Sequence, residues 1–432
     1  MNNFLYLLII ACFLSSCSLN KNSKFWTSTK KIKEESNFEK ILKKDEVLEK
    51  TFNINLKIKI DAEPTENLLE SYLRNNDGRK NFDLDFKKVS KYKFSKLKNF
   101  SQYEPILSSY KNNIIFFDNN GTILNFNDDS KIVWKKNFYS KSEKKLNPIL
   151  QFSNNDQFLI VADNIAKYYL INLETGDLIW KKDNLAPFNS QIKIYKDKFF
   201  IIDFSNTLRC FSLENGKEIW NIQTENTLIR SQKKLSMVIN NDKIFFLNSI
   251  GDITAVNINN GDLLWQLPTQ NSSIYESSFT LKNSDLVLNK EILFFSNNKN
   301  EIFSIDTNIG NFNWKNNINS SLRPTIVGNL LLTVSSEGYL FFVDKNSGNI
   351  LKVTDIFGIF KKKTRSKVYP TGFILGLNKI YLSTNIGKLL IIDVISGKII
   401  KSVKIDNEKI SRPFLINNNL FLIKDNAIIK LN

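Results

Sequence analysis

The stretch that decides the fold runs from Asn172 to Trp180 and reads Asn-Leu-Glu-Thr-Gly-Asp-Leu-Ile-Trp. Glycine follows the first residue by four positions, and tryptophan follows glycine by four more. Glycine supplies the positive φ of a tight hairpin turn, and a preceding Asp or Asn can accept hydrogen bonds from the turn backbone. The pattern therefore predicts a hairpin whose second strand contains the tryptophan.

The same pattern recurs at intervals of 38 to 49 residues, which is typical of four-stranded propeller blades. Ser130 takes the glycine position in the earliest copy, and Lys352 and Lys401 take the tryptophan position in the last two. We expect the tryptophans to cover the outermost strand and to pack between neighbouring blades, with no catalytic role. The repeat residues are Gly176, Gly216, Gly261, Gly310, Gly348 and Gly397, with Trp134, Trp180, Trp220, Trp265 and Trp314.

Counting the repeats predicts how the ring closes. Proline precedes six of the new apolar strands, as suits a strand start, and two more blades begin near Leu235 and Phe279. That makes eight blade starts but only seven turns, and the last unit, from Arg412, has only three strands. We expect residues 88–97 to supply its fourth strand. The predicted fold is all-β: an eight-bladed β-propeller of four-stranded antiparallel blades over residues 87–432, closed by an N-terminal strand.

The N-terminus carries an apolar run from Phe4 to Leu14, too short to span a bilayer but suited to a signal peptide. It ends in Leu14-Ser15-Ser16-Cys17, which resembles the lipobox of bacterial lipoproteins. The resemblance implies a signal peptide over residues 1–17 and a lipidated Cys17 as the mature N-terminus. Ser18, where some lipoproteins have Asp, resembles the signal for the outer membrane, with the chain facing the periplasm. The alternative is an ordinary secretory signal.

Residues 18–86 read as a tether and N-terminal extension. The first part is rich in Lys and Glu, as in a solvated linker. Apolar and polar residues then alternate over residues 52–60, which predicts a strand, and residues 67–74 could form one or two helical turns.

Composition limits the chemistry. The chain has no histidine, which excludes Ser-His and Cys-His nucleophiles and most zinc sites. Cleavage before Cys17 removes Cys12, and Cys17 is acylated, so Cys210 is the remaining thiol, and its apolar setting predicts a core residue. The net charge of +17 comes mostly from lysine. It fits either a compositional bias of the source genome or attraction to an anionic membrane or acidic partners.

The Asp-Xaa-Xaa-Thr/Ser-Gly-Xaa-Xaa-Xaa-Trp repeat resembles that of pyrroloquinoline-quinone (PQQ) type eight-bladed propellers, over roughly residues 97–432. One branch is the quinoprotein dehydrogenases, which hold a calcium ion and often a vicinal disulfide. This chain has no adjacent cysteines and no recognisable ligand cluster. We therefore predict no catalytic residues, no metal and no cofactor. A PQQ-dependent oxidoreductase and another binding propeller of the cell envelope, for a glycan, a peptide or a different complex, remain as alternatives.

The other branch, the BamB-like lipoproteins, also matches the lipobox and the length. This resemblance implies a non-catalytic scaffold that binds the POTRA domains of a BamA-like barrel-inserting subunit. The family contact, Leu-Xaa-Leu-Arg before the fourth blade, aligns with Leu228-Ile229-Arg230, with Thr227 in place of the first leucine. The alternative for Arg230 is an ordinary surface loop. The family's acidic positions fall on Leu281 and Asn283, and Asp285 or Glu276 could compensate.

Two further arginines, Arg323 and Arg412, occupy equivalent places before Pro324 and Pro413. We expect both near one mouth of the central channel. They could bind an anion there or cap neighbouring blades.

Overall fold

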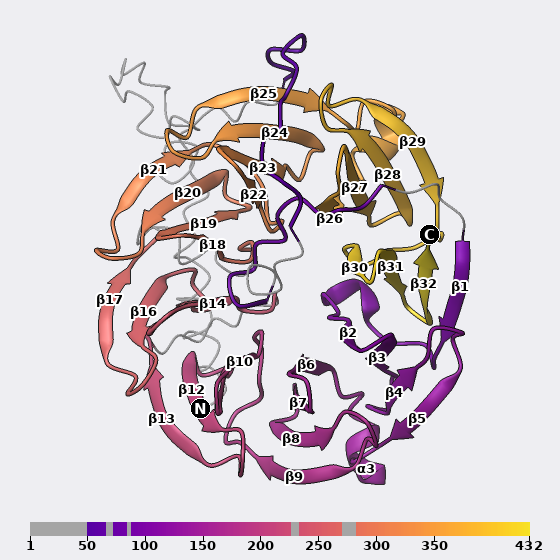
Figure 1. The fold of residues 1–432 in the computed structure, drawn as a ribbon, viewed down its shortest axis with the longest axis vertical. Coiled ribbons are helices and arrows are strands. Elements are labelled where there is room, and N and C mark those ends of the chain that lie inside the picture. The colour runs from indigo at the N-terminus through magenta and orange to yellow at the C-terminus, as the bar shows by residue number, and fades with distance from the viewer. Residues whose placement is uncertain (1–49, 66–71, 84–87, 226–232, 270–281) are drawn as a thin grey trace, which may run out of the picture. The chain divides into compact units, whose positions relative to one another are not determined.

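The computed structural model describes residues 50–65, 72–83, 88–225, 233–269 and 282–432. The chain divides into residues 1–46 and 47–432, and all described residues belong to the second unit. This unit contains eight four-stranded antiparallel sheets arranged as blades around a central axis (Figure 1). The predicted eight-bladed propeller is confirmed.

Each blade runs from a short innermost strand to an outermost strand at the rim. Blades 1 to 4 are β2 (Ser108–Tyr110), β3 (Asn113–Phe117), β4 (Ile123–Phe126), β5 (Ile132–Lys136); β6 (Leu150–Asn154), β7 (Phe158–Asp163), β8 (Lys167–Asn172), β9 (Leu178–Asp183); β10 (Lys193–Tyr195), β11 (Lys198–Ile202), β12 (Thr207–Ser212), β13 (Glu218–Gln223); and β14 (Met237–Asn240), β15 (Lys243–Leu247), β16 (Ile253–Asn257), β17 (Leu263–Leu267). Blades 5 to 8 are β18 (Val287–Asn289), β19 (Ile292–Asn297), β20 (Glu301–Asp306), β21 (Phe312–Asn316); β22 (Thr325–Val327), β23 (Leu330–Val334), β24 (Tyr339–Asp344), β25 (Ile350–Asp355); β26 (Pro370–Leu375), β27 (Lys379–Thr384), β28 (Lys388–Asp393), β29 (Ile399–Lys404); and β30 (Phe414–Ile416), β31 (Asn419–Lys424), β32 (Ala427–Leu431), β1 (Lys88–Lys93).

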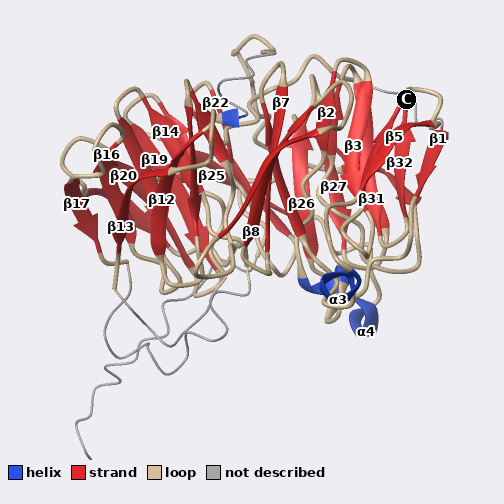
Figure 2. Ribbon diagram, turned by 90° about the horizontal axis from the view of Figure 1, so that it is seen from below, coloured by secondary structure: helices blue, strands red, loops and turns tan. Residues whose placement is uncertain are grey.

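The helices in the described residues are single turns. The 3-10 helix η1 (Phe100–Gln102) precedes blade 1, while α3 (Lys141–Lys144) and α4 (Lys362–Arg365) lie in connections between blades. Figure 2 shows α3 and α4 on the same face of the propeller. No helix in the described part of the chain is both long and apolar enough to cross a membrane.

The ring closes as the repeat count predicts. Strand β1 pairs antiparallel with β32, and Tyr92 lies opposite Ile428. The N-terminal strand thus becomes the outermost strand of blade 8, whose other three strands come from the C-terminus. The Tyr92 side chain is fully buried and its hydroxyl donates to the Asp128 carbonyl oxygen of blade 1, 3.3 Å away.

The hydrophobic core lies between the faces of neighbouring blades. One apolar cluster joins Phe200 of blade 3 to Phe246 of blade 4, and another joins Phe245 of blade 4 to Leu293 of blade 5. These side chains are fully buried because successive side chains of a strand point to opposite faces, and both faces of an inner strand meet another blade. Cys210 is a fully buried member of the first cluster.

The repeat tryptophans lie on outermost strands and pack against the turn of the next blade. The Trp265 indole nitrogen donates to the Thr307 carbonyl oxygen at 3.0 Å. Its ring covers Gly310, where φ is +71° and a Cβ would lie 2.5 Å from an indole carbon. Glycine is therefore required at Gly310 both for the turn and for the indole. The same contact joins Trp134 to Gly176, Trp180 to Gly216, Trp220 to Gly261 and Trp314 to Gly348.

Residues 50–65 contact the propeller surface, but the strand predicted over residues 52–60 is wrong. Only Phe52 pairs with the sheet, through two hydrogen bonds to Val353 of β25, at 3.0 and 3.1 Å. Ile58 is buried against blades 6 and 7, whereas Ile54 is exposed. The alternating apolar side chains thus cover the surface of neighbouring blades individually, rather than one face of a continuous sheet.

Candidate functional site

The N-terminal extension crosses the centre of the ring over residues 72–77 and then passes to blade 7, where Phe82 and Asp83 contact the connection between β26 and β27 (Figure 1). The innermost strands have free edges there, because no further strand pairs with them. The segment satisfies several of these edge groups with its own backbone. The Ile239 amide donates to the Leu73 carbonyl at 3.0 Å, the Leu288 amide to the Arg74 carbonyl at 2.9 Å, and the Lys80 amide to the Leu375 carbonyl at 3.0 Å. The axial channel is therefore filled by the chain itself.

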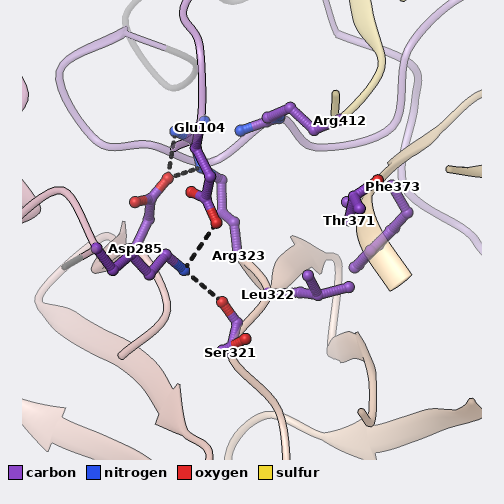
Figure 3. A pocket seen from close by; sticks show the side chains of 10 residues that line it. Glu104, Asp285, Ser321, Leu322, Arg323, Thr371, Phe373 and Arg412 are labelled. Carbon is purple, nitrogen blue, oxygen red and sulfur yellow. Dashed lines mark hydrogen bonds and ion pairs between the residues drawn. The ribbon is translucent and has the colours of Figure 1, made fainter. Parts of the chain in front are cut away.

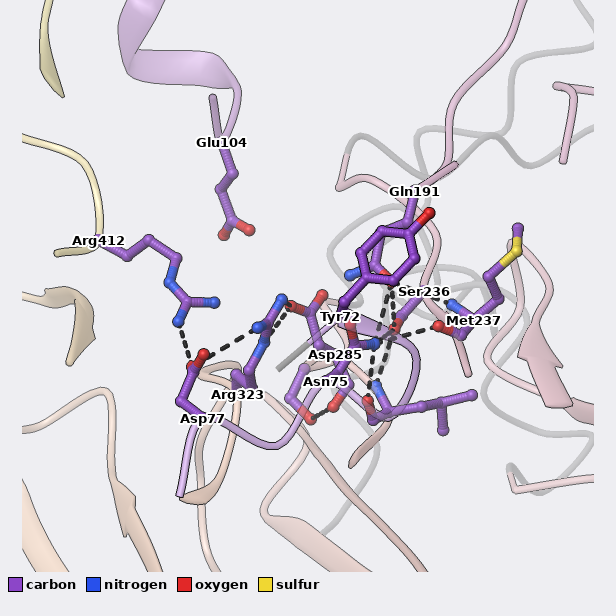
Figure 4. A network of polar contacts seen from close by, with 12 residues as sticks. Tyr72, Asn75, Asp77, Glu104, Gln191, Ser236, Met237, Asp285, Arg323 and Arg412 are labelled. Carbon is purple, nitrogen blue, oxygen red and sulfur yellow. Dashed lines mark hydrogen bonds and ion pairs between the residues drawn. The ribbon is translucent and has the colours of Figure 1, made fainter. Parts of the chain in front are cut away.

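Asn75 is the most densely bonded side chain of this segment (Figure 4). Its amide nitrogen lies 3.0–3.1 Å from four acceptors, in Gln191, Ser236, Met237 and Leu286. These acceptors belong to three different blades. Asn75 is only 1% exposed, so its polar atoms need these partners in place of water.

Lys193, on the innermost strand of blade 3, holds the same segment. Its ammonium donates to the Asn75 side-chain oxygen at 2.7 Å and to the Tyr72 carbonyl oxygen, and it lies over the Tyr72 ring. Burial, followed by repulsion from Arg323, lowers the pKa of Lys193 well below its ordinary value. The Tyr72 hydroxyl lies 2.5 Å from the Ser153 hydroxyl and accepts a hydrogen bond from the Ile194 amide, also 2.5 Å away.

Asp77 meets the two arginines expected at a channel mouth. Arg412 donates to its carboxylate, and an Arg323 nitrogen lies 3.5 Å from the same oxygen. Arg323 also pairs with Asp285 at 2.6 Å. Burial by itself would raise the pKa of Asp77, but the positive charges of Arg412 and Arg323 outweigh it, and the pKa lies below the ordinary value. Both arginines thus bind an anion, and that anion belongs to the chain's own N-terminal extension.

A small cavity adjoins these arginines (Figure 3). Its lining includes Arg323, Arg412, Asp285, Glu104 and Lys233. The Lys233 ammonium lies 3.6 Å from Glu104 and donates to the Ser321 carbonyl oxygen at 2.5 Å. The cavity volume is about 20 Å³, enough for about one water molecule. When Asp77 is included, the negative charges of the carboxylates equal the positive charges of the two arginines and Lys233. The cavity therefore has neither the space nor the net positive charge to bind an organic anion.

Lys234 lies next to this charged cluster. Its pKa is lowered to about 8, first by burial, although Asp285 and Glu104 oppose the shift.

The structure places the predicted site residues unevenly. Leu228, Ile229 and Arg230 lie outside the described residues, as does Cys17. The connection that contains the first three joins β13 to β14, and the residue that resumes the described chain, Lys233, lines the cavity. Asp285, considered as a substitute for the family's acidic positions, is buried on Arg323 and is not presented to a partner.

Sequence reasoning missed the segment from Tyr72 to Phe82. One signal was available, because Asn75-Asn76-Asp77-Gly78 is rich in turn formers, and Gly78 has a φ of +62°. A second signal was arginine itself. The chain has only seven arginines, and the six in the described residues all make fixed polar contacts.

The fold and repeat define an eight-bladed propeller whose blades are joined by indole-on-glycine contacts. Comparison with protein families matches residues 119–354 to the model described as outer membrane protein assembly factor BamB. That span is more than half of the chain, and the chain belongs to this family. No curated protein sequence matches it. Among the described residues, no group of three or more His, Cys, Asp or Glu side chains could hold a metal ion.

Solved structures show the same fold at low identity. BamB from Moraxella catarrhalis is 14% identical with a TM-score of 0.64, and the match covers 81% of this chain and 100% of that one. The quinohemoprotein alcohol dehydrogenase from Comamonas testosteroni is 7% identical with a TM-score of 0.59, covering 86% of this chain and 78% of that one. The C-terminal WD40 domain of Sif2 is 13% identical with a TM-score of 0.60, covering 81% and 99% respectively. At these identities the likeness shows the fold alone.

Proposed function

We propose that this chain is a non-catalytic scaffold of the machinery that assembles β-barrel proteins in the outer membrane. It is anchored by lipid at Cys17, faces the periplasm, and binds the POTRA domains of a BamA-like subunit. The family match over residues 119–354 carries the proposal. A propeller suits this role because a rigid ring presents many connecting loops to a partner.

The use of arginine supports Arg230 as part of the contact. In a lysine-rich chain, every arginine in the described residues binds a carboxylate, an amide or a backbone carbonyl. Arginine is therefore retained where its planar fork has a fixed partner. By this pattern we expect Arg230 to contact a partner too, and the family resemblance supports the barrel-inserting subunit as that partner.

The filled channel favours binding over quinoprotein catalysis. A planar organic cofactor needs a pocket of several hundred Å³. Here residues 72–77 lie in the channel centre, and the cavity beside them holds about 20 Å³. The residues present at the channel mouth do not fit such a group.

The test is a pull-down from detergent-solubilised membranes of the native host with the tagged full-length chain. We expect the wild type to recover the barrel-inserting subunit and Arg230→Glu to recover much less. Lys217→Glu is the matched control, since it makes the same charge change at an exposed turn of blade 3. Equal recovery by Arg230→Glu would preserve the role and reject the site. No recovery from intact complexes would reject the role.

The lipid anchor is tested separately. Cys17→Ser removes the thiol that the lipobox supplies for acylation. We expect the variant to leave the membrane fraction after a wash with sodium carbonate, whereas the wild type stays. Retention of Cys17→Ser in the membrane would argue against the anchor.

A further inference from the structure

Residues 72–80 lie in the channel in the manner of a bound peptide. Three backbone hydrogen bonds join the segment to strand edges or strand ends of blades 4, 5 and 7, at 2.9–3.0 Å. Arg79 also forms an isolated bridge with Leu375. Pairing of an extended segment with free strand edges is a general mode of peptide recognition, in which the backbone gives affinity and side-chain pockets give specificity.

Three consecutive side chains provide the specificity. Asn75 is bonded by groups from blades 3, 4 and 5, as described above. Asn76 pairs with the backbone of Ile326 in both directions, donating to its carbonyl and accepting from its amide, each at 3.1 Å. Asp77 is held by Arg323 and Arg412. Two amides followed by a carboxylate are therefore read in order around the channel.

The channel wall under this tripeptide is polar. Four polar side chains contact the tripeptide or Arg323, an arginine that holds Asp77, and each is 8% exposed or less: Gln191, Lys193, Ser236 and Asp285. Polar groups of this kind can be hydrated when a ligand leaves, whereas an apolar wall would be exposed at high cost. Apolar anchoring is confined to the flanks, where Leu73 and Phe82 are buried.

The ring closes without this segment. Strand β1 begins at Lys88, after the segment, and every blade has its four strands without residues 72–83. The segment adds side chains to three of the inter-blade clusters, Leu73 and Tyr72 to one, Tyr72 to a second and Phe82 to a third, while the rest of these clusters comes from the blades and the connections between them. Departure of the segment therefore removes no strand and leaves the tryptophan contacts between blades intact.

We propose that the axial channel is a peptide-binding site whose resident ligand is residues 72–80. The segment can leave while the propeller stays folded, and an extended peptide with an acidic side chain after two amides can take its place. In the uncut chain the resident segment is favoured, because its covalent link gives it a high effective concentration at the site.

The experiment uses the full chain with a protease site inserted between Asp85 and Phe86, cleaved after folding. The probe is a fluorescent peptide with the sequence of residues 72–83, followed by anisotropy. We expect the peptide to bind the cut chain at least tenfold more tightly than the uncut chain, by roughly the advantage that a tethered ligand has. Thermal unfolding of the cut chain, with excess peptide and without it, shows whether the propeller remains folded.

The controls are placed in the peptide, so that the propeller itself is never altered. A peptide with Asp77→Asn loses the charge held by two arginines and is expected to bind about tenfold more weakly or worse. A peptide with Asp83→Asn is the matched control. The Asp83 carboxylate pairs with Lys379 at the surface, where 35% and 27% of the two side chains is exposed, and we expect a change of less than about threefold.

Three results would overturn the proposal. The cut chain could fail to bind the peptide at a peptide concentration of about 1 mM while the propeller remains folded. The Asp77→Asn and wild-type peptides could bind equally, which would mean that the arginines do not read the carboxylate. Release of the segment could also unfold the propeller, which would make residues 72–80 a structural element rather than a ligand.

Discussion

Replacing Gly310 by alanine tests whether the tryptophan repeat joins the blades in the way the geometry indicates. Alanine would have to adopt a φ of +71°, which costs about 1 kcal/mol. Its Cβ would lie 2.5 Å from an indole carbon of Trp265, so the ring must move. Overpacking of this kind costs about 1–3 kcal/mol. A displaced indole also loses its 3.0 Å hydrogen bond to Thr307, worth about 1 kcal/mol. The expected loss of unfolding free energy is about 3–5 kcal/mol.

Gly328→Ala is the matched control. Gly328 has a φ of +55°, but the nearest atom to a Cβ there is the Ala62 methyl carbon, at an ordinary contact distance of 3.6 Å. Only the backbone cost applies, so we expect a loss of about 1 kcal/mol. The difference between the two variants isolates the indole contact from the turn conformation.

The assay is urea unfolding of a chain that lacks residues 1–17, followed by tryptophan fluorescence and circular dichroism. The reasoning predicts that Gly310→Ala loses at least 2 kcal/mol more than Gly328→Ala, the sum of the lowest overpacking and hydrogen-bond costs, roughly 1 kcal/mol each. Equal losses would refute it, since they would show that the indole yields freely and that glycine serves only the turn.

The remaining predictions concern two buried groups. The pKa of Lys234 is about 8 in the folded chain against 10.5 ordinarily, so between those pH values the unfolded state binds a proton that the folded state does not. The stability of the wild type should therefore rise from pH 8 to 10.5 relative to that of Lys234→Met. At pH 7 the Lys234→Met variant should have the higher melting temperature. Parallel curves of melting temperature against pH for the two proteins would contradict this. Burial raises the pKa of Cys210 to about 12, and thiolate is the reactive form. A chain without residues 1–17 should resist a disulfide reagent at pH 8 and react with one thiol in urea, whereas fast labelling of the folded chain would show that blade 3 opens.

The fold could be predicted because the residues that join neighbouring blades recur at the same position of successive repeats. Four repeats contain both residues of a recurring contact, a tryptophan and a glycine that is covered by the tryptophan of the preceding blade. The one turn without glycine has a physical reason. Ser130 faces the outermost strand of blade 8, where Tyr92 replaces tryptophan and bonds Asp128 of the same turn. No indole has to fit there, so a side chain is tolerated even with a φ of +62°.

The N-terminal extension could not be predicted because its contacts have no sequence period. Asn75 binds groups that are 116, 161 and 211 residues away, each from a different blade. Such polar contacts leave no hydrophobic pattern, and only the closed ring brings the three blades together. Over residues 52–60 the pattern was present but misleading, since alternating apolar residues fit a blade surface as well as a sheet face.

Arg323 and Arg412 show where sequence reasoning ends. Their equivalent positions in two repeats place both guanidinium groups at the channel, since the connection before an innermost strand lies near the axis. Two partly buried cations so close together repel, and a carboxylate between them relieves that repulsion. Sequence position alone therefore left two possibilities open, an anion between the arginines or capping of neighbouring blades. The structure supplies the anion, since Asp285 pairs with Arg323, while Asp77 reaches both arginines. The extension thus answers an electrostatic requirement that the blades create, and its carboxylate is the group by which the channel distinguishes one peptide from another.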